Sequence, residues 1–180
     1  MVDKNTNNGE ERIGCIDYRA MIVRVYSHRG AVLTLRGVSY GAVLISAAMF
    51  ILRVCLLLFG GEMAFALKLL AVAAVPFLLV SLLRKIINAQ RPYELIGDFP
   101  RRPKNKSGES FPSRHTFSAF LIATLLLPWS VTIAAVLYLL SVMLAVARVL
   151  LGIHFVRDVV AGAVIGIVCG AVGIAVIGLI

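Results

Sequence analysis

The sequence predicts an all-α, polytopic membrane helix bundle with about five transmembrane helices and an N-terminal interfacial helix. The 180 residues are 60% hydrophobic with a mean hydropathy of +0.94, whereas soluble domains are about 45–50% apolar. The apolar residues also gather in runs of about 20, the length that crosses a hydrocarbon core of about 30 Å. Charged residues and turn-forming residues separate these runs and so divide the chain into spans.

The first part of the chain is polar. We expect residues 1–37 to form a polar N-terminal segment and residues 38–180 to form the membrane domain. Residues 18–37 mix apolar side chains with Arg at short intervals, which favours an amphipathic helix lying on the membrane surface. A helix that packs on a soluble partner is the alternative.

The predicted spans follow in order. They cover residues 38–60, 63–83, 112–127, 131–151 and 157–180. Arg53 falls inside the first span, where a charged residue is a functional candidate, but snorkelling toward the nearby interface is the simpler interpretation. The glycines of the last span are spaced so that another helix can pack closely against it.

The charge distribution indicates which partners and which membrane side to expect. The net charge is +9, and the basic residues lie at helix ends and in one loop, an arrangement that argues against a nucleic-acid partner and favours membrane lipids or an anionic ligand. Five spans place the N-terminus, the 84–111 loop and the 148–157 turn on one side. Six basic residues precede position 37, so the positive-inside rule places that side in the cytoplasm. We therefore expect a bacterial inner-membrane protein with a cytoplasmic site; a missed span would move the site outside.

Polar residues from three separate helix ends should meet at this interface. Between His115 and Arg148 the chain crosses the membrane and returns, because each leg is about 15–20 residues or roughly 25–30 Å of helix. Arg84 and Arg91 follow the second span on the same side. The fifth span begins there with His154 and Asp158.

These residue types suit transfer of a phosphoryl group. His154 and Asp158 are spaced i, i+4, so a carboxylate can orient an imidazole that acts as nucleophile. His115 can protonate a leaving oxygen. Arg84, Arg91 and Arg148 offer forked cationic donors for phosphate oxygens, and Ser113 with helix N-terminal amides adds further donors. Each residue alone has a simpler interpretation as a structural His or a topology-determining Arg; the ordered combination is what is specific.

The combination resembles the type-2 phosphatidic acid phosphatase superfamily, which includes membrane lipid phosphatases, vanadium haloperoxidases and bacterial acid phosphatases. The family motifs Lys-x6-Arg-Pro, Pro-Ser-Gly-His and Ser-Arg-x5-His-x3-Asp correspond here to Arg84-x6-Arg91-Pro92, Pro112-Ser113-Arg114-His115 and Ala147-Arg148-x5-His154-x3-Asp158. The resemblance implies that His154 forms a phosphohistidine, Asp158 orients it and His115 is the general acid. It also implies that Arg84, Arg91, Ser113 and Arg148 bind phosphate.

Three positions depart from the family pattern: Arg84 stands for Lys, Arg114 for Gly and Ala147 for Ser. Arg114 can still offer its amide to phosphate if its φ is negative, and its side chain is a candidate for binding a second phosphate or a head group. If it instead blocks the site, the protein is a weakened lipid-phosphate binder or transporter.

We expect a metal-independent lipid phosphate or diphosphate phosphatase without a cofactor. The three cysteines are far apart and form neither a disulfide framework nor a metal motif. Candidate substrates are a phosphatidate, a phosphatidylglycerol phosphate and a polyprenyl diphosphate of the undecaprenyl type, whereas the related haloperoxidases are soluble. The sequence leaves the lipid tail and the oligomeric state open.

Overall fold

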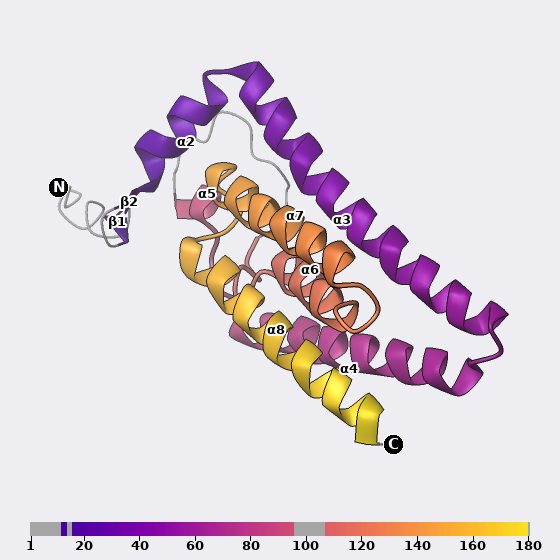
Figure 1. Cartoon of the computed structure of the whole chain (residues 1–180). Coiled ribbons are helices and arrows are strands. Elements are labelled where there is room, and N and C mark those ends of the chain that lie inside the picture. Colours follow the sequence, from indigo (N-terminus) through magenta and orange to yellow (C-terminus); the bar gives the residue numbers. More distant parts are fainter. Residues whose placement is uncertain (1–11, 14–15, 96–106, 180) are drawn as a thin grey trace, which may run out of the picture.

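The computed structural model describes residues 12–13, 16–95 and 107–179. The chain begins with a short antiparallel pair, β1 (Arg12–Ile13) and β2 (Ile16–Asp17). The rest of the described chain is helical or connecting structure, as Figure 1 shows. The helices are α2 (Tyr18–Tyr26), α3 (Arg29–Phe59), α4 (Met63–Ile87), α5 (Pro92–Leu95), α6 (Arg114–Leu125), α7 (Val131–Leu150) and α8 (Val156–Leu179). Four cationic residues of the predicted basic loop, Arg101, Arg102, Lys104 and Lys106, lie outside the described residues.

The helical membrane bundle predicted from the sequence is confirmed. Among the described helices, α3, α4, α7 and α8 are long and apolar enough to cross a membrane. Their outward faces carry many exposed large hydrophobic side chains, such as Leu44, Leu78 and Leu139. In a soluble protein such a surface would promote aggregation, whereas lipid tails solvate it.

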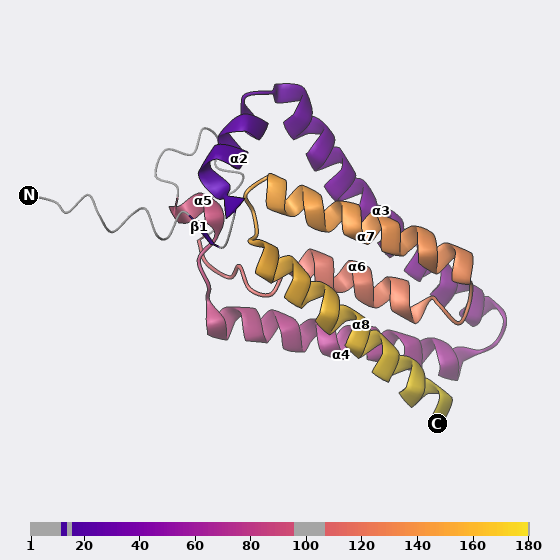
Figure 2. The ribbon, with the colours of Figure 1, turned by 60° about the vertical axis from the view of Figure 1, so that its left-hand side comes forward.

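The helix at the third predicted span is shorter than expected. Helix α6 has 12 residues, or about 18 Å at about 1.5 Å per residue, which is less than a hydrocarbon core of about 30 Å. It contacts α3, α4, α7 and α8, and Figures 1 and 2 both show it among them. Because neighbouring helices surround it, α6 is largely buried in protein rather than in lipid.

Three glycines allow α8 to pack closely against α6. A Cβ atom at Gly162 would lie 2.7 Å from the carbonyl oxygen of Ser113, and one at Gly166 would lie 2.5 Å from that of Phe117. At Gly170 it would lie 2.5 Å from Cβ of Thr124. These contacts confirm the close helix packing predicted from the glycine spacing, and they hold the start of α6 beside the start of α8.

The predicted interfacial helix is also shorter than its sequence range. Asp17 caps α2 by accepting a hydrogen bond from the Ala20 amide at 3.0 Å, and α2 ends at Tyr26. After a bend at Ser27-His28, residues 29–37 belong to the long helix α3, so the chain turns earlier than predicted. The cause is local: the carbonyls of Val23 and Val25 already accept from the Ser27 and His28 amides, which closes the first helix.

The bundle has two chemically different ends. Helices α2 and α5, the start of α6, the end of α7 and the start of α8 lie together at one end, and the α3–α4 turn and the C-terminal end of α8 lie toward the other (Figures 1 and 2). The end that includes α2 carries the predicted polar residues.

Candidate active site

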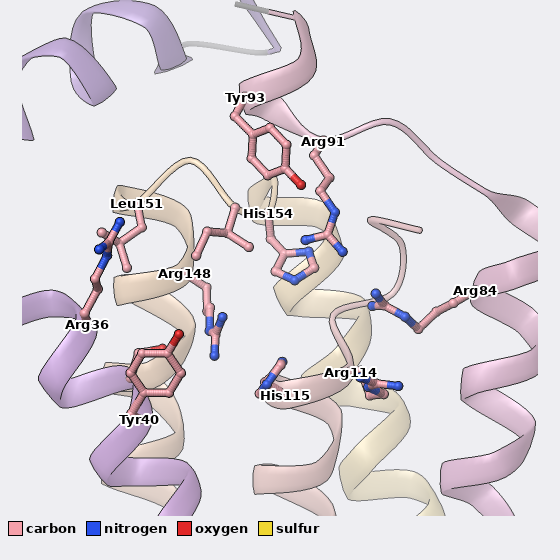
Figure 3. A pocket seen from close by; sticks show the side chains of 12 residues that line it. Arg36, Tyr40, Arg84, Arg91, Tyr93, Arg114, His115, Arg148, Leu151 and His154 are labelled. Carbon is pink, nitrogen blue, oxygen red and sulfur yellow. The ribbon is translucent and has the colours of Figure 1, made fainter. Parts of the chain in front are cut away.

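A polar cavity lies at this end of the bundle, where several helix ends converge. Its volume is about 230 Å³, and Figure 3 shows the side chains that line it. Six predicted site residues line it: Arg84, Arg91, Arg114, His115, Arg148 and His154. The structure therefore brings together residues that are up to 70 positions apart in the sequence (154 − 84 = 70).

His154 and Asp158 form a buried pair, as their i, i+4 spacing predicts. His154 is 2% exposed and Asp158 is fully buried. Nδ1 of His154 is 3.6 Å from Oδ2 of Asp158, which is an electrostatic contact rather than a hydrogen bond. The same Oδ2 accepts a hydrogen bond from the Phe155 amide at 3.0 Å and one from the Ser110 hydroxyl. Catalytic hydrogen bonds are often long without substrate, so this pair can tighten on binding.

Ser110 is a site residue that the sequence did not predict. It is fully buried, and its Oγ lies 3.4 Å from Nδ1 of His154. It thus contacts both members of the His154–Asp158 pair, from a position 44 residues earlier in the chain. The signal in the sequence is only a serine two positions before Pro112.

The surroundings of His154 keep its imidazole neutral. Burial is the largest cause, and with the positive charges of Arg91 and Arg84 it lowers the pKa of His154 from 6.5 to about 4. The contact with Asp158 acts in the opposite direction and does not reverse the shift. At neutral pH His154 therefore has a lone pair on one ring nitrogen, which a nucleophile requires.

Arg84 and Arg91 secure the loop before α6. Both are buried. The Arg84 guanidinium donates to the carbonyls of Pro112 and Glu109, and Arg91 donates from Nε to the Gly108 carbonyl at 2.8 Å. These predicted phosphate-binding residues thus line the cavity and also fix the backbone beside it.

Side chains of Glu94 and Asn88 hold the same loop through its backbone amides. The Gly108 amide donates to Oε1 of Glu94 at 2.7 Å, and the Glu109 amide donates to Oδ1 of Asn88 at 3.2 Å. Gly108 and Glu109 both have positive φ, 69° and 53°, a conformation that costs free energy for a non-glycine residue. The loop adopts this turn because arginine, glutamate and asparagine side chains hold it.

Arg148 is a buried cation of the cavity with unpaired donors, unlike Arg84 and Arg91, which donate to loop carbonyls. It is 4% exposed, and its Nε and Nη2 atoms have no hydrogen-bond partner within the described chain. The Tyr40 ring lies below its guanidinium at 5.9 Å. A buried guanidinium with two unpaired N–H groups has a desolvation cost that a bidentate anion would offset. Arg148 is therefore the strongest indication of an anion-binding site.

The three predicted site residues at the start of α6 lie in different surroundings. Ser113 is buried outside the cavity lining, and its Oγ is 3.0 Å from Oγ1 of Thr116. Arg114 is the first helical residue, and its φ is not among the positive values, so its amide lies in the first turn where helices leave N–H groups unpaired. Its guanidinium lies over the Phe77 ring of α4 at 5.7 Å. His115 projects into the cavity (Figure 3).

Helix α2 braces the turn that carries His154. Tyr18 is 4% exposed, and its ring meets that of Phe155 edge-on at 5.2 Å. Its hydroxyl accepts a hydrogen bond from the Val156 amide at 3.2 Å, and the Tyr26 hydroxyl donates to the Leu151 carbonyl at 3.4 Å. The apolar face of this helix therefore packs on the protein's own α7–α8 turn.

The fold and this cavity together define a class of membrane protein with an arginine-lined cavity beside a buried His–Asp pair, an arrangement that suits a phosphate-like anion. The PAP2 superfamily model matches residues 65–178, and the chain belongs to that superfamily. It is accordingly a membrane lipid phosphatase, a phosphoric monoester hydrolase. No curated protein matches the chain.

Two solved structures are similar over most of the chain. LpxE of Aquifex aeolicus has a TM-score of 0.68 and 28% identity, with 88% of this chain and 92% of that chain covered. A transmembrane PAP2-type phosphatidylglycerolphosphate phosphatase from Bacillus subtilis has a TM-score of 0.65 and 23% identity, with 91% and 83% covered. At 23% identity, the comparison with the Bacillus subtilis protein shows a similarity of fold alone.

Proposed function

We propose that this protein removes a phosphate group from a membrane lipid through a phosphohistidine formed on His154, without a metal ion. The observation that supports it most is the Arg148 guanidinium, which is buried in the same cavity as His154 with two nitrogen atoms that have no partner in the described part of the chain. Arg84, Arg91 and Arg114 line that cavity too. Four guanidinium groups supply the charge that stabilises a phosphoryl group during transfer.

In the first step, Nε2 of His154 attacks phosphorus while Nδ1 faces Asp158. A P–N bond forms and the P–O bond to the lipid alcohol breaks. His115 gives its proton to the leaving oxygen, so the lipid leaves as a neutral alcohol. Asp158, held by Ser110 and the Phe155 amide, stabilises the charge that develops on His154.

In the second step, water attacks the phosphohistidine. His115 takes a proton from that water, the P–N bond breaks, and inorganic phosphate leaves with His154 restored. Arg114 takes part through its helix-terminal amide, and its guanidinium, which lies over Phe77 at the edge of the cavity, contributes charge. Ser113 positions the first turn through Thr116 and contributes at most its backbone to phosphate.

We further propose that the site faces the cytoplasm of a bacterial inner membrane. Helix α2 contacts the turn that carries His154, so the basic N-terminal residues Arg19 and Arg24 lie at the same end of the bundle as the site. The turn at the opposite end, residues 60–62, contains no Lys or Arg. Cysteine reporters at Ser27 and Ser130, in a background without Cys15, would test this: an impermeant thiol reagent applied to intact cells should label only the Ser130→Cys protein.

Phosphate release by the purified protein in detergent tests the activity. In EDTA, the wild type should release phosphate from at least one of three lipids: phosphatidate, phosphatidylglycerol phosphate and a polyprenyl diphosphate. The rates of release rank the three as substrates. His154→Ala should abolish release while its melting temperature stays close to that of the wild type. Strong activity in His154→Ala, or loss of wild-type activity in EDTA with recovery on adding a metal, would refute the mechanism.

A further inference from the structure

A second cavity, of about 320 Å³, adjoins the arginine-lined one. Arg114 and His115 line both. The other residues of the second cavity come from three helices: Val43, Ser46 and Ala47 of α3, Phe77 of α4, and Ser118, Ala119 and Ile122 of α6. We call it the α3–α6 groove.

One face of α3 lines both cavities. Arg36, Ser39 and Tyr40 border the arginine-lined cavity, and Val43, Ser46 and Ala47 border the groove. This spacing of three and four residues marks a single helical face. Ala47 lies seven residues beyond Tyr40, or about 10 Å deeper along the helix axis. The groove thus leads from the polar cavity into the part of the bundle that lipid surrounds.

The order of groups along this path matches an in-line reaction. His154 borders only the arginine-lined cavity, whereas His115 stands where the two cavities join. Figure 3 shows the two histidines facing each other across the cavity, with Arg148 and Arg84 on either side. In-line displacement places the leaving oxygen opposite the nucleophile, which is the side of His115 and of the groove.

We propose that the α3–α6 groove holds the hydrocarbon-bearing alcohol that leaves from the substrate, so that α3 selects the lipid tail. This inference rests on the proposed function. The volume is near the lower end of ligand pockets, about 300–1,000 Å³, which suits part of a lipid. Helix α3 precedes the residues that the superfamily model matches, 65–178.

Two features of the groove fit a lipid alcohol. The Ser46 side chain is 1% exposed, and its Oγ has no hydrogen-bond partner in the described part of the chain. An ester oxygen of a diacylglycerol backbone would satisfy it. Arg114 lies against Phe77 on the α4 side, where its charge can stay near the phosphate while the apolar groove continues past it.

Adjacent alanines provide a matched test. Ala47 lines the groove and is half-buried, whereas Ala48 is exposed on the lipid-facing side of the same turn. In the full-length protein, Ala47→Phe should lower kcat/KM for dioleoyl phosphatidate by about tenfold or more relative to that for p-nitrophenyl phosphate. Ala48→Phe should leave the ratio of the two at its wild-type value.

Three results would overturn the proposal. The first is an unchanged ratio of the two kcat/KM values in Ala47→Phe, which is expected if ordinary bilayer lipid fills the groove. The others are an equal loss of kcat/KM on both substrates in Ala47→Phe, or the same change of the ratio in Ala48→Phe. A photo-cross-linking experiment tests, without relying on catalysis, whether the lipid tail occupies the groove. A non-hydrolysable phosphonate lipid with a diazirine in its acyl chain should label peptides containing residues 43–47 or 118–122. Excess phosphatidate, but not phosphatidylcholine, should prevent labelling, and Ala47→Phe should reduce it. If the wild type releases no phosphate, the proposed function fails, and this labelling still accepts or rejects the groove.

Discussion

Replacing Arg148 with Met should lower activity without lowering stability. Its Nε and Nη2 atoms are buried and have no partner among the residues that the structure describes, so the substitution removes no hydrogen bond made by those atoms. With phosphate bound, the two N–H groups would make two charge-assisted hydrogen bonds of about 1.5–3 kcal/mol each. A loss of about 3–6 kcal/mol corresponds to roughly 10²–10⁴-fold in kcat/KM, at about 1.4 kcal/mol per tenfold.

Arg84→Met is the matched comparison. The Arg84 guanidinium donates to the carbonyls of Pro112 and Glu109, and a buried carbonyl left unpaired costs about 1–3 kcal/mol. Two such carbonyls correspond to a decrease in melting temperature of about 5–20 °C for a chain of this size. Activity should fall as well, because the loop that carries Ser110 loosens.

Phosphate release and thermal unfolding in the same detergent measure both effects. We predict that both variants lose activity but differ in melting temperature. Arg148→Met should melt within about 2 °C of the wild type, whereas Arg84→Met should melt clearly lower. Arg148→Lys should recover part of the activity, because a point charge replaces the fork. The reasoning fails if Arg148→Met keeps wild-type kcat/KM, or if it is destabilised as much as Arg84→Met.

Three further predictions concern His154 and its supports. Ser110→Ala should lower kcat by about tenfold with little change in KM, because Asp158 loses a donor, and the pH profile of kcat should shift. Tyr18→Phe should reduce kcat less than Tyr18→Ala does, because Phe keeps the ring contact with Phe155 and loses only the hydroxyl. Because the pKa of His154 is lowered to about 4 from 6.5, the protein should keep its full stability above pH 6.5 and lose stability progressively as pH falls toward 4, since unfolding then binds a proton. His154→Asn should flatten that dependence of melting temperature on pH.

Each of these has a contrary result. A Ser110→Ala protein with a wild-type pH profile would show that the serine does not position Asp158. Equal kcat values for the two Tyr18 variants would assign no role to the ring. A melting temperature with the same dependence on pH in the wild type and in His154→Asn would attribute the acid sensitivity to other groups.

The bundle and the convergence of the site could be predicted because each depends on a repeated local rule. Runs of about 20 apolar residues mark the spans, and crossing the membrane twice returns Arg148 to the side of His115. The same rule overestimates the length of α6, because a helix enclosed by neighbouring helices need not match the thickness of the hydrocarbon core. The hydropathy of residues 112–127 does not distinguish protein contacts from lipid contacts.

The contacts that support the site could not be predicted because they join distant segments through single atoms. Ser110 meets Asp158 across 48 positions, and Tyr18 meets Val156 across 138. The motif spacing also predicts Arg84 and Arg91 as phosphate ligands without indicating that they donate to loop carbonyls. Such pairings depend on how the helices pack, and no spacing along the chain encodes them.

Trapping the covalent intermediate tests the central claim most directly. Purified protein is mixed for milliseconds with phosphatidate labelled with ³²P in its phosphate, quenched in base and digested for peptide mapping. We predict acid-labile, base-stable label on the peptide containing His154, in the wild type and not in His154→Ala. Label on any other residue, or phosphate release by the wild type with no labelled peptide at any quench time, would contradict the phosphohistidine mechanism.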